Sequence, residues 1–251
     1  MLRLVRNAYL DEDVNKFYNH ELKAKSIFYI KHIDKPLAYN FVRKYHYLED
    51  AKFFCVHAYG LFHKRTHVLV GVATYSNPQG ISSLKGWFKE SNQNKDILEL
   101  SRLCMLPSLN GTNATSYLLG NSMKIMHKEF GIKAVITLAD SSRHVGSIYQ
   151  VCNFKYFGMT DVKSDFYTES GKVNPRGSTR DVFGVWLPRT RKHRYAYIMD
   201  KSLEVQYKEQ IRPTVDETTI KTCCNGTNRV YDNRFNRHYT CPICCGELKL
   251  I

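Results

Sequence analysis

The alternation of apolar and polar positions predicts mixed helices and strands in the first half of the chain. A helix is predicted from Lys35, with Leu37, Phe41 and Val42 on one side. Two β-rich runs, 53–59 and 67–75, are joined by a polar turn and predict an antiparallel pair. Residues 76–96 are rich in Ser, Asn, Gly and Lys and predict a surface loop, and residues 97–105 predict a further strand.

The second half continues the pattern with two helices and three strands. Leu119, Met123, Met126 and Phe130 recur at helical spacing and predict a helix over 116–130, which Gly131 ends. The run 134–139 is wholly apolar, as expected of a central strand. A helix near 144–152 and strands near 154–159 and 182–187 complete the series. The order predicts one mixed, mostly antiparallel sheet with helices, and it excludes a doubly wound nucleotide fold.

Length and composition indicate a globular protein with a sizeable core. The chain has 251 residues, of which 43% are hydrophobic and 24% charged. We expect one α/β domain over residues 1–200 and a Cys-rich appendage over 201–251, with a polar helical stretch between 203 and 213.

No apolar run approaches the roughly 18 residues of a membrane span, and the first residues lack a signal-peptide core. The sequence therefore predicts no membrane partner and a cytoplasmic protein.

The charge of the chain favours a polyanionic partner. The formal net charge is +14, and nucleic acid is the commonest partner of so basic a protein. Between residues 172 and 201 the chain carries eight Lys or Arg against two Asp, a net +6. Such a run is usually a solvated face, yet its density favours phosphate contacts, and Tyr195 and Tyr197 offer rings for base stacking. The candidate DNA-binding residues are Arg176, Arg180, Arg189, Arg191, Lys192 and Arg194.

Five of the eight cysteines lie in the last 29 residues and predict a structural zinc site. Cys241-Pro-Ile-Cys244 is typical of a zinc knuckle, and an upstream pair would complete a ribbon. That upstream pair is adjacent, which departs from the usual spacing, so His238 or Cys245 can substitute. A redox-inert tail is the alternative. The candidate zinc ligands are Cys223, Cys224, Cys241 and Cys244, whereas Cys55, Cys104 and Cys152 fit buried structural thiols.

The Asn/Gly/Thr-rich loop at 107–115 opens a helix, and a helix N-terminus suits a pyrophosphate. The segment from Gly146 to Gly158 is predicted to form a helix that contains Tyr149. Asn153 and Phe154 then connect this helix to a strand. It resembles the last core unit of the GCN5-related N-acetyltransferase (GNAT) fold, in which a Tyr often protonates the leaving thiolate of coenzyme A. The usual acyl-CoA signature, R/Q-x-x-G-x-G/A, is absent from the loop.

Four separated motifs together resemble the Mom family of phage DNA-modification proteins. They are Phe41-Val-Arg-Lys-Tyr-His-Tyr47, Leu98-Glu-Leu-Ser-Arg-Leu103, Asn113-Ala-Thr-Ser116, and Ala139-Asp140 followed by Gly146-Ser-Ile-Tyr149. The resemblance covers about residues 37–190. It implies a GNAT-like enzyme that converts adenine in double-stranded DNA to an N6-methylcarbamoyl form and so protects the DNA from restriction.

The resemblance also implies a set of site residues. Catalysis would fall to Asp140, Tyr149, Arg102 and Tyr47, and binding of acetyl-CoA or another acyl carrier to Asn113, Thr115 and Ser116. Arg102 could clamp a phosphate or a developing oxyanion. Asp140 could accept a proton from an exocyclic amine or only cap the next turn. For His46, a packing role is favoured over a site role by roughly two to one.

Two other functions remain open from the sequence. One is a non-catalytic DNA-binding protein that uses a zinc ribbon as its reader. The other is an acetyltransferase that acts on a protein or a small amine, in which the positive charge has no direct role.

Overall fold

The computed structural model describes residues 13, 16–17, 23–46, 53–78, 86–89, 96–173, 183–214, 229–232 and 237–240. Their contacts divide the chain into two compact units, and each unit is discontinuous in sequence. The first unit comprises Met1–Thr137, Ser147–Phe157 and Tyr195–Gln210. The second comprises Leu138–Gly146, Gly158–Arg194 and Ile211–Ile251.

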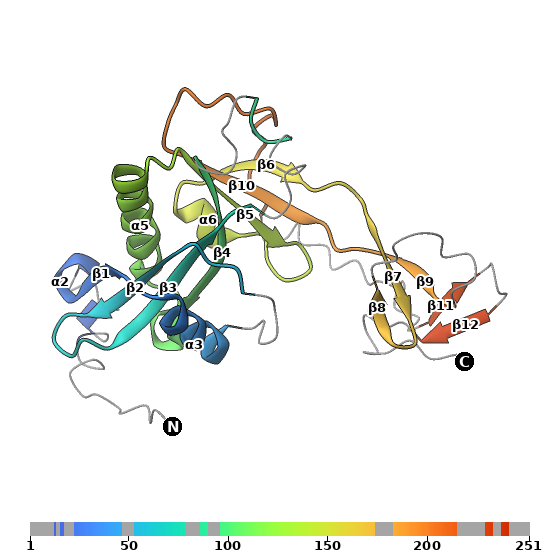
Figure 1. Ribbon diagram of the computed structural model, residues 1–251, viewed down its shortest axis with the longest axis horizontal. Coiled ribbons are helices and arrows are strands. Elements are labelled where there is room, and N and C mark those ends of the chain that lie inside the picture. The colour runs from blue at the N-terminus through green and yellow to red at the C-terminus, as the bar shows by residue number, and fades with distance from the viewer. Residues whose placement is uncertain are drawn as a thin grey trace. The chain divides into compact units, whose positions relative to one another are not determined.

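A seven-stranded mixed sheet organises the chain, in the strand order β1-β2-β3-β4-β5-β10-β6 (Figure 1). Strands β1 to β4 pair antiparallel in sequence order, and β4 pairs with β5 in parallel. The mixed α/β fold class expected from the sequence is therefore confirmed, and the apolar β5 is an internal strand as predicted. The strands are β1 Phe28–His32, β2 His57–His63, β3 Leu69–Ser76, β4 Ile97–Met105, β5 Ala134–Asp140, β6 Lys155–Met159 and β10 Lys192–Ile198.

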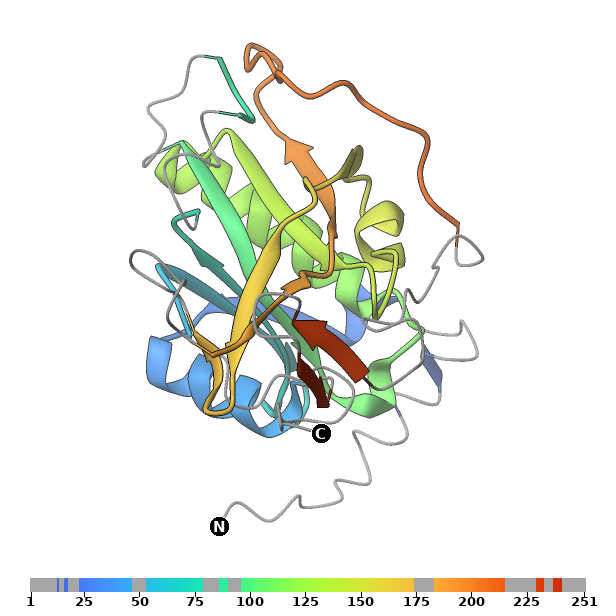
Figure 2. The same ribbon diagram turned by 90° about the vertical axis from the view of Figure 1, so that its right-hand side faces the viewer.

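Two longer helices lie along this sheet, α3 (Lys35–Tyr45) and α5 (Ala114–Phe130) (Figure 1, Figure 2). Asp34 caps α3, because its Oδ1 accepts a hydrogen bond from the Leu37 backbone N–H at 2.8 Å. Helix α5 ends at Gly131 in a left-handed conformation (φ 67°), as the sequence predicted. The shorter helices are α2 (Ala24–Ile27), the 3₁₀ turn η1 (Pro107–Leu109) and α6 (Ser147–Val151).

The apolar faces of these helices pack on the sheet much as the periodicity predicted. Ala38, Phe41 and Val42 of α3 are buried, and Met123 and Met126 of α5 are buried. Leu37 and Phe130 differ from expectation: they are 42% and 48% exposed. Each lies near an end of its helix, and the half-exposed Phe130 ring still lies 4.4 Å from the His57 ring of β2.

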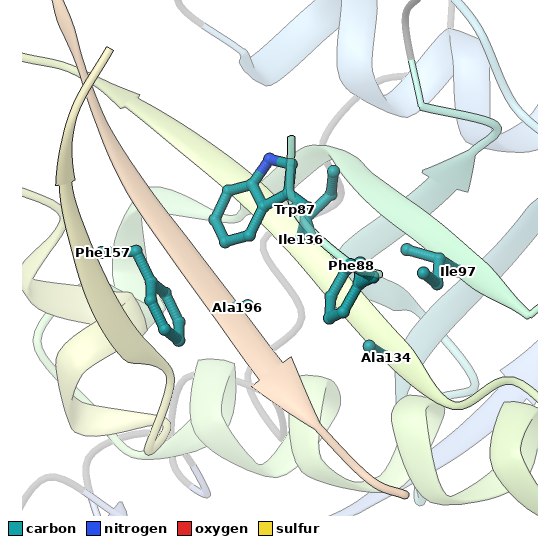
Figure 3. Close-up of a cluster of buried hydrophobic side chains, with 7 residues drawn as sticks. All are labelled: Trp87, Phe88, Ile97, Ala134, Ile136, Phe157 and Ala196. Carbon is teal, nitrogen blue, oxygen red and sulfur yellow. The ribbon is translucent and has the colours of Figure 1, made fainter. Parts of the chain in front are cut away.

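A cluster of buried side chains corrects the prediction of a surface loop over 76–96. Trp87 and Phe88 are 3% and 1% exposed and pack in the core of the first unit (Figure 3). Phe88 also forms a β-bridge with Val205, and the Trp87 ring lies 5.2 Å from Tyr207. The remaining members of the cluster come from four strands: Ile97, Ala134, Ile136, Phe157 and Ala196.

Residues 203–210 complete this cluster rather than form a polar helix. Leu203, Val205 and Tyr207 pack against it, and Gln206 N–H donates to the Trp87 carbonyl at 2.8 Å. The prediction of a helix over 203–213 is therefore wrong for the described residues. Backbone groups of this segment pair instead with residues 87–89 of the same chain. The division into domains 1–200 and 201–251 stays a prediction.

The second unit contains two small sheets. Strands β7 (Ser164–Thr168), β8 (Gly171–Val173) and β9 (Val185–Pro188) form an antiparallel sheet in the order β8-β7-β9. Strands β11 (Arg229–Asp232) and β12 (Arg237–Thr240) form a hairpin. The sequence predicted a last strand over 182–187; it corresponds to β9, and β10 follows it in the main sheet. The basic residues of β10 obscured that strand in the sequence pattern.

No helix among the described residues is long and apolar enough to cross a membrane.

Candidate functional site

Strand β4 positions Arg102 by means of a β-bulge. Thr74 of β3 pairs with Arg102 and Tyr75 pairs with Leu100, so Ser101 is an extra residue on β4. A bulge of this kind re-aims the neighbouring side chains and is common beside active sites. The Arg102 Nη1 donates to the Ser101 carbonyl at 2.6 Å, which holds the half-buried guanidinium close to its own strand.

The Ser101 hydroxyl ties three segments together at the bulge. Its Oγ lies 3.0 Å from the Thr74 Oγ1, 3.1 Å from the Thr74 carbonyl oxygen and 3.0 Å from the Phe54 carbonyl oxygen. Because Ser101 has one hydroxyl hydrogen, the two carbonyl oxygens share it, whereas the Thr74 hydroxyl can donate its own hydrogen to the Ser101 Oγ. The result is a fixed junction of β3, β4 and the segment before β2, directly next to Arg102.

His46 and Arg102 are neighbours in the first unit. His46 is the C-cap residue of α3, and its backbone N–H donates to the Val42 carbonyl at 2.8 Å. Burial, aided by the nearby Arg102 charge, lowers the pKa of His46 to about 4. The imidazole is therefore neutral at physiological pH and carries an acceptor nitrogen beside a permanent cation. The sequence favoured a surface or packing role for His46, and its half-buried position near Arg102 leaves a site role as a prediction.

Tyr149 lies among aromatic rings of the first unit. Its ring centroid is 5.7 Å from Phe154 and 5.5 Å from Tyr195. Tyr195 is fully buried, and its hydroxyl accepts a hydrogen bond from Gln150 Nε2 at 3.0 Å. The prediction that Tyr195 stacks on a base is thus wrong, because its ring belongs to the core. Tyr197 is only partly buried, with its ring 5.5 Å from that of Phe154, and its role in base stacking stays a prediction.

Asp140 ends β5 in the second unit and caps the turn that follows. Its Oδ1 accepts hydrogen bonds from the Ser142 N–H at 3.0 Å and from the Ser142 hydroxyl at 2.7 Å. Its carbonyl accepts from the N–H groups of Arg143 and His144, each at 3.0 Å. These bonds match the capping interpretation that the sequence left open. A role in proton transfer stays a prediction.

The residues predicted to bind the acyl carrier lie in the first turn of α5. The Ser116 hydroxyl donates to the Asn113 carbonyl at 2.8 Å, and Thr115 is nearly buried. Asn113 is the N-cap residue but makes no side-chain cap bond. Thr112 provides a side-chain bond instead, because its Oγ1 accepts a hydrogen bond from the Ala114 N–H at 3.3 Å. The Thr112 hydroxyl also donates to the Leu109 carbonyl at 2.7 Å. Carrier binding here would therefore use the backbone N–H groups of the turn more than these side chains.

Two of the predicted DNA-binding arginines, Arg189 and Arg194, are engaged by other groups of the second unit. Arg189 is held by the buried Asp165 through Nε at 3.0 Å. Arg194 has an 11% exposed side chain, with Nη1 donating to the Met159 carbonyl at 2.5 Å. These two serve the structure of the second unit. Arg191 is exposed, and its Nε donates to the Thr160 carbonyl at 2.7 Å, while Lys192 is half-buried.

Seven predicted site residues lie outside the described part of the chain. Among the described residues, no group of three or more His, Cys, Asp or Glu could hold a metal ion. The zinc prediction rests on residues beyond them, and it stays a prediction. The residues concerned are Tyr47, Arg176, Arg180, Cys223, Cys224, Cys241 and Cys244.

Sequence reasoning included Ser101 in a motif but missed its contacts with Thr74 and Phe54. No local pattern marks them, because the bulge exists only once the register of β3 against β4 is known. Thr112 carries a recognisable signal, since a Thr hydroxyl commonly accepts a hydrogen bond from the backbone N–H two residues later.

Several acetyltransferases of known structure are similar to the chain at low identity. Spermidine/spermine N-acetyltransferase from Vibrio cholerae is 10% identical over 70% of this chain and 95% of its own, with a TM-score of 0.42. Ribosomal-protein-S5-alanine acetyltransferase from Vibrio fischeri is 11% identical over 69% and 94%, with a TM-score of 0.43. A GNAT family acetyltransferase from Elizabethkingia anophelis, with acetyl-CoA bound, is 13% identical over 68% and 97%, with a TM-score of 0.40. At these identities and TM-scores, the similarities establish nothing about activity.

No curated protein matches the chain. The family model of the Mom protein family, in contrast, matches residues 27–215. That segment contains Arg102, Asp140 and Tyr149 together with the whole seven-stranded sheet. The chain belongs to the Mom protein family.

Proposed function

We propose that the protein transfers a small acyl-derived group, the methylcarbamoyl group, to N6 of adenine in DNA and so protects the DNA from restriction. The observation that carries the proposal is the match of the Mom family over residues 27–215, which spans all three central candidates for catalysis. The net charge of +14 supports a polyanionic substrate.

The transfer requires a bond between the exocyclic nitrogen and the acyl carbon of the donor. The nitrogen loses a proton, and the leaving group of the donor gains one. Asp140 is the proposed proton acceptor and Tyr149 the proposed proton donor. Arg102 would stabilise negative charge on the acyl oxygen, since its guanidinium is permanently charged and held to β4. An adenine in a duplex must also leave the base stack to reach such groups.

The donor is proposed to be acetyl-CoA or another acyl carrier. Acetyl-CoA by itself would deliver only an acetyl group, so a methylcarbamoyl product requires a carrier whose transferred group already contains the nitrogen. Either donor would supply an activated acyl carbon bonded to a good leaving group, and that bond breaks as the bond to N6 forms. The first turn of α5 could hold the anionic part of such a carrier, because N–H groups at a helix start lack intrahelical partners and the helix dipole is positive there. Gly111, at φ 79°, allows the backbone to turn into that helix.

Nucleoside mass spectrometry tests the proposal directly. The protein is expressed in a bacterium, the host DNA is digested to nucleosides, and the products are compared with those from a Tyr149→Phe variant. We expect a modified adenosine whose added mass identifies the transferred group, and much less of it from the variant. Removing only the hydroxyl preserves the ring contacts with Phe154 and Tyr195.

The rival functions give different results in the same experiment. Unmodified DNA from a folded protein that binds DNA would contradict the enzymatic proposal and favour the binding protein. Acetylated host proteins with unmodified DNA would favour the acetyltransferase of proteins or amines.

We also infer that the chain binds one structural zinc ion through Cys223, Cys224, Cys241 and Cys244. The described support is the β11–β12 hairpin, in which Arg229 pairs with Thr240. Cys224 precedes β11 by a few residues, and Cys241 directly follows β12. Two cysteine segments joined by a hairpin are the usual arrangement of a zinc ribbon.

A further inference from the structure

Helix α3 carries an exposed row of basic and aromatic side chains. Lys35, Tyr39 and Arg43 are spaced four residues apart and are all exposed. Residues at this spacing lie on one side of a helix. The helix contains no Asp or Glu between Lys35 and Tyr45, and the adjacent carboxylate of Asp34 is engaged as the helix cap.

A ring contact places Tyr39 against the segment before β2, and the Lys35 charge acts on a thiol of the same segment. The Tyr39 ring lies 5.4 Å from the Phe53 ring in an edge-on arrangement. Burial raises the pKa of the Cys55 thiol, and the nearby Lys35 charge opposes that rise. The Tyr39 side chain nevertheless stays 41% exposed, so it presents an aromatic surface between two cations.

Helix stability does not account for these residues. A cation in the first turn, as at Lys35, is unfavourable beside the positive end of the helix dipole. An exposed Tyr also forms helix less readily than Ala or Leu. Arg43 in the last turn does suit the dipole, so Lys35 and Tyr39 are the more informative members of the row.

The row leads to the candidate site within one compact unit. Helix α3 ends at Tyr45, and its C-cap residue His46 is the neighbour of Arg102. Lys35 and Arg43 are separated by about 12 Å along the helix axis. A DNA strand carries one phosphate for about every 3.4 Å of duplex axis, so several phosphates fit between them.

We propose that the row formed by Lys35, Tyr39 and Arg43 binds the phosphate backbone of DNA and leads the strand to the His46–Arg102 end of α3. The proposal rests on DNA being the substrate in the proposed function. It assigns binding to α3 in addition to the basic stretch 172–201, where Arg189 and Arg194 are already engaged by Asp165 and by the Met159 carbonyl. Lys35 and Arg43 would contact phosphates, and the Tyr39 ring would pack on a sugar or an unstacked base.

The salt dependence of DNA affinity tests the proposal. The full-length protein, a Lys35→Gln/Arg43→Gln variant and a control Lys124→Gln/Lys128→Gln variant bind a fluorescein-labelled duplex at several salt concentrations. Lys124 and Lys128 are exposed on α5, so the control changes the net charge equally. Circular dichroism confirms that each variant is folded.

Loss of two phosphate contacts should reduce the slope of log affinity against log salt by about 1.8, which weakens binding by about 60-fold near 0.1 M salt. We expect this change for the α3 variant and little change for the α5 control. Tyr39→Ala should weaken binding with an unchanged slope, and Tyr39→Phe should bind as the wild type does.

Two outcomes would overturn the proposal in distinguishable ways. If both double variants weaken binding equally, α3 has no special role, while DNA remains a partner and the proposed function stands. If the wild-type protein shows no salt-dependent DNA binding at all, DNA as the substrate is contradicted as well.

Discussion

His46 combines a neutral imidazole with a permanently charged neighbour, Arg102. A His with an ordinary pKa of 6.5 would be partly protonated near neutral pH. Burial and the Arg102 charge instead lower the pKa of His46 to about 4. The ring can therefore accept a hydrogen bond or a proton at pH 7, beside a group suited to holding negative charge.

We expect the His46 ring to titrate at about pH 4 in the folded protein. The measurement is the pH dependence of its carbon-bound proton shifts by NMR, assigned with a His46→Gln variant. Because burial is the larger cause, Arg102→Gln should raise the pKa only part of the way to its ordinary value. A midpoint near 6.5 in the wild type would contradict the described environment.

The lowered pKa of His46 also makes the folded state less stable as the pH falls. The unfolded chain takes up a proton on His46 below about pH 6.5, whereas the folded chain resists it until about pH 4. The His46 contribution to folding is therefore full above the higher value and is lost as the pH falls between the two. His46→Gln should reduce the loss of stability over this range, as measured by urea unfolding at a series of pH values.

At the scale of elements, the β7–β8–β9 sheet is organised around one buried carboxylate. Asp165 is 6% exposed and accepts hydrogen bonds from Lys172 at 2.7 Å and from Arg189 at 3.0 Å. Burial alone would raise the pKa of Asp165, but the bonds and charges of these two cations outweigh it, so the pKa lies below its ordinary value. The carboxylate thus links β8, β7 and the residue that follows β9.

Asp165→Asn should destabilise this sheet by roughly 1–2 kcal/mol, since both cations are half exposed and each pair is partly screened by solvent. The measurement is hydrogen exchange of the β7 amides. The control is Asp161→Asn, because Asp161 is 83% exposed and pairs with Arg194 only at 3.5 Å. An equal effect of the two variants would contradict the organising role of Asp165.

The destabilisation caused by Asp165→Asn should also depend on pH and become smaller in acid. A carboxylate with a lowered pKa stabilises the fold above its unfolded value, which is about 4. The difference between wild type and Asp165→Asn should therefore shrink as the pH falls below about 4.

At the scale of the whole molecule, the positive charge is spread over both units rather than confined to 172–201. Exposed cations occur on α3 and α5 in the first unit and at Arg191 in the second. The half-buried Arg194 and the exposed Arg189 are engaged within the protein. The net charge alone therefore does not locate a DNA surface, because burial and pairing decide which cations remain available to phosphates.

The zinc prediction also belongs to the whole chain. Native mass spectrometry of the full-length protein should show one bound zinc ion, and a Cys241→Ser/Cys244→Ser variant should lose it. A Cys55→Ser variant is the matched control, since Cys55 is a free thiol in the first unit. A wild-type mass without metal after purification in zinc-containing buffer would contradict the ribbon.

The sequence by itself determined the elements whose signal is local. The helical spacing of apolar residues and the Gly131 stop predicted α5, and the wholly apolar run at 134–139 predicted β5 as an internal strand. Arg102 and Tyr149 were proposed as site residues from their motifs, and that role stays a prediction. Each signal lies within a short window, where side-chain periodicity and backbone preference act between near neighbours.

Only the tertiary structure decided the features that depend on pairing between distant segments. The bulge at Ser101 depends on the register of β3 against β4, and the His46–Arg102 proximity depends on the packing of α3. The burial of Trp87 depends on residues 203–207, more than a hundred positions away. A short stretch of sequence contains only one of the two partners in each such contact. Burial and hydrogen bonding require both partners, so these features follow from the fold alone.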